Sequence, residues 1–306
     1  MKSIFLSGLL LLLSSVVLAQ SATSDSFRFA VTADMRFVSG PEKDTIDKYR
    51  GVLEALQKVG AGEFMVSPGD IDPPQNVRWS INKYLGINYP WYPVVGNHEE
   101  ETKEDMTWLR NYNKDGDALP RIVNHGPAGT EETTFSFDFK NAHFVVINEY
   151  YDGTCDTCLD GDVSDPLYAW LRDDLQKTTR KYIFIFGHEP AFPQPDSYTF
   201  NLRHYGNSLD KYRQHRDRFW NLLEENNVVA YFCGHTHCFS AVVINNVWQI
   251  DAAHARGGGD KSSTMPSTFL TVDVFSDKVQ ATVYRNIDDP KYRYRDYTAT
   301  FELRKK

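Results

Sequence analysis

Short runs of β-branched and aromatic residues recur along the chain and predict buried strands. Between the early runs, apolar residues return with the period of an amphipathic helix, as in Lys43–Val59. After an opening run in Phe27–Asp34, the predicted strands of the first part are Phe64–Ser67, Trp91–Val95, Thr133–Phe139, Ala142–Asn148 and Tyr182–Phe186. The further predicted helices are Val77–Leu85, Glu104–Tyr112, a segment from Ser164 or Asp165 to Leu175, and Ser208–Glu225.

The last part of the chain is rich in strands. Its predicted strands are Val228–Cys233, Phe239–Ile244, Val247–Asp251, Thr268–Phe275, Val279–Arg285 and Tyr297–Leu303. Alternating helices and strands followed by such an end predict an α/β protein in which sheets pack together and helices lie outside. One long connection, Glu189–Asn207, precedes the last predicted helix.

The first residues have the pattern of a secretory signal peptide. A positive start at Met1-Lys2 precedes the apolar run Ile4–Leu18, and Val17-Leu18-Ala19 forms a small-residue cleavage site. An uncleaved signal anchor is the alternative, but the run is short and weakly flanked for that role. We therefore expect residues 1–19 to be a signal peptide. Residues 20–306 contain no linker rich in Pro, Gly or Ser and are expected to form a single domain, secreted or periplasmic.

Charge narrows the range of partners. The chain has 306 residues and a formal net charge of −8. An acidic surface gives no general attraction for nucleic acid, and we expect no membrane contact after signal cleavage. A small phosphorylated substrate stays compatible with this charge, because bound metal ions can outweigh the overall field locally.

Four cysteines fall into two pairs. Cys155 and Cys158 lie in the sequence CDTC, while Cys233 and Cys238 flank the sequence GHTH. In an exported protein the CDTC pair is expected to close a small disulfide loop, with two free thiols as the next interpretation. A thiol redox motif would open a helix after a strand, whereas this pair lies among Asp and Gly residues. Cys233 ends a predicted strand and is expected in the core.

Five blocks place a carboxylate, amide or imidazole in the loop after an apolar run. They are FRFAVTAD (Phe27–Asp34), FMVSPGD (Phe64–Asp70), PVVGNHE (Pro93–Glu99), IFIFGHEP (Ile183–Pro190) and VVAYFCGHTH (Val228–His237). Strand ends of an α/β sheet converge on one crevice, so these polar groups are expected to meet. Asp, Asn and His side chains brought together are ligands suited to a pair of metal ions.

In these blocks the chain resembles the calcineurin-like metallophosphoesterases, the superfamily that includes purple acid phosphatases. The resemblance runs from about Phe27 to His237, and its most specific parts are GNHE at Gly96–Glu99 and GHTH at Gly234–His237. It implies an αββα sandwich of two mixed sheets flanked by helices. It also implies an exported, metal-dependent hydrolase of phosphate esters, either a phosphomonoesterase or a phosphodiesterase.

The resemblance also implies the site. The metal ligands would be Asp34, Asp70 and His237 for one ion, and Asp70, Asn97, His188 and His235 for the other. The two divalent or trivalent ions would be iron, manganese or zinc, and their bound water would attack phosphorus. His98 would stabilise phosphoryl oxygens or protonate the leaving group, with Glu99 orienting its ring. Taken singly, each of these residues is more often a turn, cap or loop residue.

Two positions depart from the family pattern. Many members have a His where this chain has Arg36, and purple acid phosphatases have a Tyr where it has Pro73. The first metal site therefore lacks one expected ligand, and Asp72 is either a substitute or a turn carboxylate. Arg36 either clamps a substrate phosphate or pairs with Asp34 or Asp72. The alternative function is a catalytically weakened protein that binds metal or phosphate with a depleted first site.

Further candidates lie in two loops. Arg203 and His204, in the long connection before the last helix, are expected at the substrate rim. His254 and Arg256 precede Gly257–Gly259, which is either a close phosphate approach or a plain flexible turn. The remaining candidates, His125, His143 and His215, are interpreted as structural.

Overall fold

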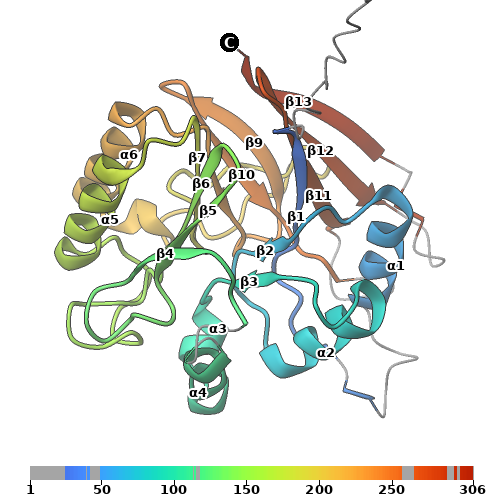
Figure 1. Ribbon diagram of the computed structural model, residues 1–306, viewed down its shortest axis with the longest axis horizontal. Helices are drawn as coiled ribbons and strands as arrows, with labels where there is room; N and C mark the ends of the chain where they lie inside the picture. The colour runs from blue at the N-terminus through green and yellow to red at the C-terminus, as the bar shows by residue number, and fades with distance from the viewer. Residues whose placement is uncertain are drawn as a thin grey trace, which may run out of the picture.

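The computed structural model describes residues 25–38, 40–41, 49–112, 114, 118–256, 265–287, 293–294 and 297–305. The predicted signal peptide and Gly257–Gly259 lie outside the described residues. Within them, the strands form two sheets that pack face to face, with helices on both outer sides (Figure 1).

The first sheet has six strands among the described residues, in the order β13-β12-β11-β1-β2-β3. Their bounds are β1 Phe27–Val31, β2 Met65–Ser67, β3 Trp91–Pro93, β11 Ser267–Val274, β12 Lys278–Asn286 and β13 Tyr297–Lys305. Strands β1, β2 and β3 are parallel, while β11, β12 and β13 extend the sheet from β1 by antiparallel pairs. The carboxyl ends of the three parallel strands therefore face the same way.

The second sheet has seven strands among the described residues, in the order β4-β5-β6-β7-β8-β10-β9. Their bounds are β4 Ile122–His125, β5 Phe135–Phe139, β6 Ala142–Val146, β7 Tyr182–Phe186, β8 Ala230–Cys233, β9 Phe239–Ile244 and β10 Val247–Ala252. Strands β6, β7, β8 and β10 are parallel, and the outer pairs are antiparallel. Both sheets are thus mixed, which confirms the expected αββα sandwich.

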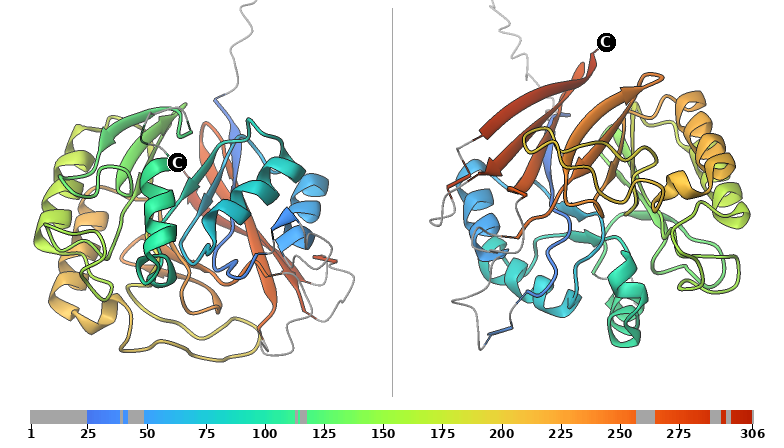
Figure 2. Two further views of the ribbon diagram at one scale, coloured as in Figure 1. Left: turned by 90° about the horizontal axis from the view of Figure 1, so that it is seen from below. Right: turned by 180° about the vertical axis from the view of Figure 1, so that it is seen from behind.

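Helices cover the outer faces of the two sheets, as Figure 2 shows from two further sides. Their bounds are α1 Tyr49–Val59, α2 Pro74–Leu85, α3 Asn97–Glu100, α4 Lys103–Tyr112, α5 Asp165–Lys177 and α6 Arg213–Glu225, with a 3₁₀ helix, η2, at Leu209–Lys211. Helices α1 and α2 pack on the first sheet, and α5 and α6 pack on the second. Each helix pair buries an apolar stripe against strands that are apolar on both faces.

Aromatic side chains fill the space between the sheets. The ring of Phe29 on β1 stacks on Phe64 with centroids 5.5 Å apart, and meets Phe144 on β6 edge-on at 5.3 Å. All three side chains are fully buried. Burial of each contributes about 1.5–3 kcal/mol relative to exposure, and the offset and edge-on geometries add to that. This layer fixes the two sheets, and so the loops at their strand ends, relative to one another.

Three elements differ from the sequence predictions. Strand β4 and the short helix α3 were not predicted, and the segment expected to be one helix from Ser208 is divided into η2 and α6. The division occurs at Tyr212, whose backbone angles of φ −105° and ψ 68° are not helical. In the helix predicted from Lys43, residues 43–48 lie outside the described residues.

The cysteines are arranged as the sequence predicts. Cys155 and Cys158 form a disulfide, and Cys233 and Cys238 are buried thiols. Within the described residues, no helix has both the length and the hydrophobicity that a membrane crossing requires.

His143, on β6, is a buried histidine held between two carboxylates. Its Nδ1 lies 2.8 Å from Asp138 Oδ1 and its Nε2 lies 2.9 Å from Asp174 Oδ2, with 3% of the side chain exposed. Burial acts to lower the pKa of His143, but the hydrogen bonds to Asp174 and Asp138 outweigh it and raise the pKa. The imidazolium therefore stabilises the fold, as a structural histidine should.

Replacement of this residue is expected to cost stability in a pH-dependent way. Because its pKa is raised on folding, the contribution is complete below its unfolded value and is lost as pH rises through the folded value. His143→Gln should lower the free energy of unfolding by about 1.5–3 kcal/mol near pH 5.5 and by much less near pH 9. Urea unfolding at both pH values measures this. Exposed His125 provides the control in His125→Gln, and equal losses for His143→Gln at both pH values would contradict the argument.

Candidate metal centre

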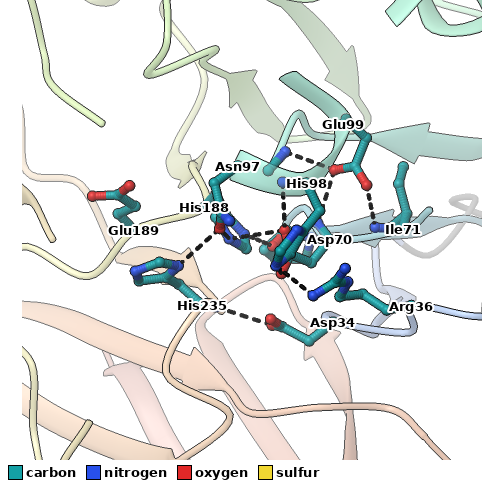
Figure 3. A network of polar contacts seen from close by, with 12 residues as sticks. Asp34, Arg36, Asp70, Ile71, Asn97, His98, Glu99, His188, Glu189 and His235 are labelled. Atoms are coloured by element: carbon teal, nitrogen blue, oxygen red, sulfur yellow. Dashed lines mark hydrogen bonds and ion pairs between the residues drawn. The ribbon is translucent and has the colours of Figure 1, made fainter. Parts of the chain in front are cut away.

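The five sequence blocks meet where their strands end. Asp34 follows β1, Asp70 follows β2, Asn97 follows β3, His188 follows β7, and His235 and His237 follow β8. Strands β1, β2 and β3 are parallel, and so are β7 and β8. The loops of each sheet therefore all leave it at the carboxyl ends of its strands. Figure 3 shows the side chains of Asp34, Asp70 and Asn97, from the first sheet, close to those of His188 and His235, from the second.

The local backbone is unusual at four of these residues. Asp34, Asp70, His235 and His237 have φ angles of 53°, 52°, 68° and 58°. Residues other than glycine are uncommon in this left-handed region, and such residues gather at functional sites. Neighbouring glycines allow the loops to approach closely. A Cβ atom on Gly69 would lie 2.3 Å from His188 Nδ1, and one on Gly234 would lie 2.3 Å from Asp34 Oδ2.

Asp34, Asp70 and His237 form the first ligand group. One ligand atom from each lies within 4.8 Å of the others. Asp34 Oδ1 is 3.3 Å from His237 Nε2 and is a buried atom without a hydrogen-bond partner. A buried carboxylate oxygen without a hydrogen-bond partner is energetically unfavourable unless a cation binds it. The group therefore fits a metal ion both by its donor chemistry and by its unsatisfied oxygen.

Asp70, Asn97, His188 and His235 form the second ligand group. Asn97 Oδ1 lies 3.2 Å from His188 Nε2 and 3.1 Å from His235 Nδ1. Asp70 Oδ1 lies 3.4 Å from His188 Nε2, so Asp70 takes part in both groups. All six predicted ligands are thus brought together in one place.

Backbone carbonyls fix the two imidazoles of the second ligand group. His188 Nδ1 lies 2.9 Å from Pro68 O, and His235 Nε2 lies 3.3 Å from Asn207 O. A carbonyl only accepts, so the ring proton of each histidine sits on that outer nitrogen and the inner nitrogen presents a lone pair. The inner nitrogens face oxygen atoms of Asn97 and Asp70. Outer hydrogen bonds of this kind are the usual support of metal-binding histidines.

The electrostatics favour a bound cation as well. Burial raises the pKa of Asp34 well above its usual value, and the charges of Asp70 and Asp251 raise it further. Burial also lowers the pKa of His188 and of His235 to about 3, so both rings are neutral near pH 7. Neutral imidazoles are the form that binds metal ions, and a cation would offset the burial and charge repulsion that raise the pKa of Asp34.

Glu99 does not orient the His98 ring, which corrects the expectation from sequence. Its buried carboxylate accepts hydrogen bonds from the backbone N–H groups of Asp70, Ile71 and Gly96, at 2.9, 2.8 and 2.8 Å. Glu101 instead lies 3.1 Å from His98 Nδ1. On a helical turn, adjacent side chains point apart and residues three apart face each other. Glu99 therefore fixes the loop that carries Asp70.

Arg36 is paired with Asp72 and also contacts His98. Its Nε lies 3.0 Å from Asp72 Oδ1, and its Nη1 meets His98 Nε2. A guanidinium only donates, so His98 Nε2 accepts and the ring proton lies on Nδ1, facing Glu101. The two readings of Arg36 are therefore compatible, because Nε serves the ion pair while Nη1 faces the site.

Asp72 does not join a ligand group. Its carboxylate is occupied by Arg36, and the carboxylate–imidazole cluster found among the described residues contains Asp34, Asp70 and His237 instead. The first ligand group consequently consists of Asp34, Asp70 and His237. This is the set expected when Arg36 stands where many family members have a His.

The rim contains charged and imidazole groups from two loops. His204 stacks near His235 with ring centroids 4.1 Å apart, and Arg203 Nη2 lies 3.3 Å from His204 Nε2. Arg256 Nε donates to Asp34 O at 3.2 Å. His254 is buried beside His237, with ring centroids 5.8 Å apart, and meets the carbonyl of Met265 at 2.9 Å. Residues of both candidate loops thus adjoin the centre.

Sequence reasoning missed a supporting carboxylate beneath His188. Glu149 is fully buried and accepts hydrogen bonds from the backbone N–H groups of His188 and Glu189 at 2.9 and 2.7 Å. Tyr231 donates its hydroxyl hydrogen to the same carboxylate at 2.5 Å. The sequence did contain a signal for Glu149. This residue follows the apolar run in FVVINE, just as polar residues follow apolar runs in the five blocks.

Comparisons with known proteins agree with this geometry. The model of the calcineurin-like phosphoesterase family matches residues 27–239. The structure titled "GAP50 the anchor in the inner membrane complex of Plasmodium" has 15% identity and a TM-score of 0.52, covering 92% of this chain and 90% of its own. The structure of PhoD has 13% identity and a TM-score of 0.54, covering 90% of this chain and 68% of its own. At these identities the likeness concerns the fold alone.

Among curated protein sequences, none matches this chain significantly. The matched region, residues 27–239, covers more than half of the chain and contains all five blocks and both ligand groups. The chain belongs to the calcineurin-like phosphoesterase family.

Proposed function

We propose that this protein hydrolyses phosphate esters with two metal ions, one in each ligand group. The observation that carries the proposal is the junction of the two groups at Asp70, whose carboxylate faces ligands of both. When bound, such ions activate water and neutralise charge on the phosphoryl oxygens. The substrate is a small phosphorylated molecule, and iron, manganese and zinc all suit these donors.

His98 and Arg36 are proposed to act on the phosphoryl group. In the structure, Arg36 Nη1 donates to His98 Nε2. An anionic substrate would accept that hydrogen bond instead, leaving Nε2 available to carry a proton. Glu101 at Nδ1 and Asp70 Oδ2, 3.7 Å from Nε2, would stabilise the resulting imidazolium. His98 would then protonate the leaving oxygen, while Arg36 holds the phosphate as a planar donor.

Export is proposed as well. The signal-peptide pattern at residues 1–19 supports it, and the Cys155–Cys158 disulfide suits an oxidising compartment. The mature chain should begin at Gln20 in material collected outside the cytoplasm. An N-terminal sequence beginning at Met1 in that material would contradict cleavage.

One observation favours a second candidate function. The first ligand group has three candidate protein ligands, and Arg36 occupies the position where many members of the family have a His. A protein with a weak first site would bind metal or phosphate without efficient turnover. Hydrolysis of nitrophenyl phosphate and bis-nitrophenyl phosphate by the metal-loaded protein separates the candidates. Turnover that stops with a chelator supports the hydrolase, and tight phosphate binding without turnover supports the binding protein.

Arg36→His tests whether the first ligand group is short of a ligand. Histidine restores the donor found in relatives, so affinity for Mn²⁺ at the weaker site should rise roughly tenfold or more by calorimetric titration. Arg36→Ala is the matched control, because it removes the guanidinium without adding a donor. It should weaken substrate binding or turnover and leave metal content unchanged. Unaltered metal affinity in Arg36→His would show that the native group is already complete.

A further inference from the structure

Exposed apolar side chains gather in one segment of the chain. Within the described residues, nine large hydrophobic side chains are exposed, and five of them lie between residues 198 and 212. These five are Tyr198, Phe200, Leu202, Tyr205 and Tyr212. We call the part of the chain that carries them, Tyr198–Arg213, the aromatic segment. Single exposed hydrophobic residues are ordinary, whereas a cluster of this size marks an interaction surface.

Two buried aspartates hold the backbone of the aromatic segment. Asp196 Oδ1 accepts a hydrogen bond from the backbone N–H of Tyr198 at 2.9 Å, while its Oδ2 forms a buried ion pair with Arg285 at 2.6 Å. Asp210 Oδ2 accepts from the backbone N–H of Gly206 at 2.7 Å. The exposed side chains therefore cannot move into the core unless these buried polar contacts break, which costs free energy.

Phe200 is the most exposed of the five side chains, at 78%, and its backbone lies in the left-handed region with a φ of 59°. Bulky residues are rare in this region, and strained residues gather where a function depends on them. The backbone N–H of Phe200 donates to Asp196 O at 3.0 Å and so closes a tight turn. This turn leaves Phe200 and the following apolar residue, Leu202, in solvent.

Cationic groups accompany the apolar side chains. Arg203 and Arg213 have no carboxylate partner within the part of the chain that the structure describes, whereas Lys211 pairs with Asp160. The aromatic segment contains these three cations and one carboxylate, Asp210, so it is locally positive in a chain with a net charge of −8. The expectation of no membrane contact rested on the charge of the whole chain, which this segment does not share.

The aromatic segment also adjoins the metal centre. The rings of His204 and His235 lie with centroids 4.1 Å apart, and His235 Nε2 lies 3.3 Å from Asn207 O. The right-hand view of Figure 2 shows this part of the chain crossing the outside of the molecule toward η2 and α6. Whatever binds the aromatic segment is therefore held close to the second ligand group.

A lipid surface fits this combination of side chains better than a second protein does. Phenylalanine and leucine on a fixed turn suit the acyl boundary of a bilayer, tyrosines suit the headgroup level, and arginines attract anionic headgroups. The five side chains expose on the order of 600 Å², which is less than the about 800 Å² per partner that a stable protein interface buries.

We propose that the aromatic segment docks this protein on anionic lipid membranes. Phe200 and Leu202 enter the interface, while Arg203 and Arg213 contact the phosphate headgroups. The metal centre is then held next to the lipid surface. This inference is independent of the proposed function, because docking requires neither bound metal nor turnover.

Vesicle cosedimentation tests the proposal. The processed protein is used, so that the apolar run of the signal peptide does not contribute. Vesicles contain phosphatidylcholine alone or an equal mixture with phosphatidylglycerol. The wild type should bind the mixed vesicles, and binding should weaken as salt rises. A variant with Phe200→Asn and Leu202→Asn should bind roughly tenfold or more weakly for each side chain replaced. Asparagine tolerates the left-handed backbone at position 200, so the thermal unfolding midpoint should be unchanged.

Ile87 and Val243 provide the matched control. They are 73% and 49% exposed and lie outside the aromatic segment, against 78% and 49% for Phe200 and Leu202. A variant with Ile87→Asn and Val243→Asn removes a similar exposed apolar surface and should bind mixed vesicles as the wild type does. An equal loss of binding in this control would show that no particular segment docks, and would overturn the proposal.

Two further results would also overturn it. One is a wild type that binds neither kind of vesicle, or a Phe200/Leu202 variant that binds mixed vesicles as tightly as the wild type does. The other comes from light scattering without vesicles: wild-type dimers that the Phe200/Leu202 variant does not form would assign the aromatic segment to a second copy. Arg203→Gln with Arg213→Gln should weaken binding to mixed vesicles and leave binding to phosphatidylcholine unchanged. Equal effects on both vesicles would remove the headgroup contacts from the proposal.

Discussion

His188→Ala is expected to lose bound metal and hydrolysis together. The substitution removes the imidazole whose Nε2 faces both Asn97 Oδ1 and Asp70 Oδ1, at 3.2 and 3.4 Å. Alanine offers no donor, so one ion should bind weakly and turnover should fall by on the order of a hundredfold or more. Metal content by plasma mass spectrometry and initial rates on nitrophenyl phosphate measure the two effects in the same preparation.

His235→Ala should behave in the same way, since His235 Nδ1 faces Asn97 from the other side. His215 is the matched control, because it is an imidazole that pairs with Asp162 away from both ligand groups. His215→Ala should keep metal and rate. If His188→Ala and His235→Ala both retain full metal content and rate, the assignment of the second ligand group is wrong.

His98→Asn is expected to slow turnover while metal content is kept. His98 belongs to neither ligand group, yet its Nε2 lies 3.7 Å from Asp70 Oδ2 and meets Arg36. Asparagine preserves a polar side chain but cannot deliver a proton, so kcat should fall by roughly a hundredfold or more. The loss should be smaller for esters whose leaving groups need no proton. A series of phosphate esters with graded leaving-group pKa values measures this.

The outcome of that series separates two roles. A slope that is steeper for His98→Asn than for the wild type supports proton donation to the leaving oxygen. Loss of metal in His98→Asn without a change in rate per bound metal would instead make His98 a ligand. That result would remove the proton-donor role.

The sandwich and the strand-end loops were predictable because buried parallel strands must be continuous apolar runs. Strand β4 was not, since its four residues alternate between half-buried and exposed positions and contain Asn124 and His125. Helix α3 depends on contacts distant in sequence, because Asp70 Oδ1 accepts from the His98 backbone N–H at 3.2 Å. No local pattern records such a contact.

The convergence of the six candidate ligands was predictable from residue order, whereas the positions of the supporting groups were not. Glu99 and Glu101 lie two residues apart, and only helical geometry decides which of them reaches His98. Glu149 supports His188 from the end of another strand. The double role of Arg36 depends on the direction of each nitrogen, which sequence does not encode locally. The contacts of each of these residues depend on the tertiary fold and not on the local sequence.

The most direct test of the account is metal content measured together with hydrolysis in the wild-type protein. The two ligand groups predict at least one tightly bound transition-metal ion per chain after dialysis. They also predict that hydrolysis of nitrophenyl phosphate disappears with a chelator and returns with manganese, iron or zinc. Hydrolysis that continues after complete metal removal would contradict the account, as would a protein with both groups intact that binds none of these metals.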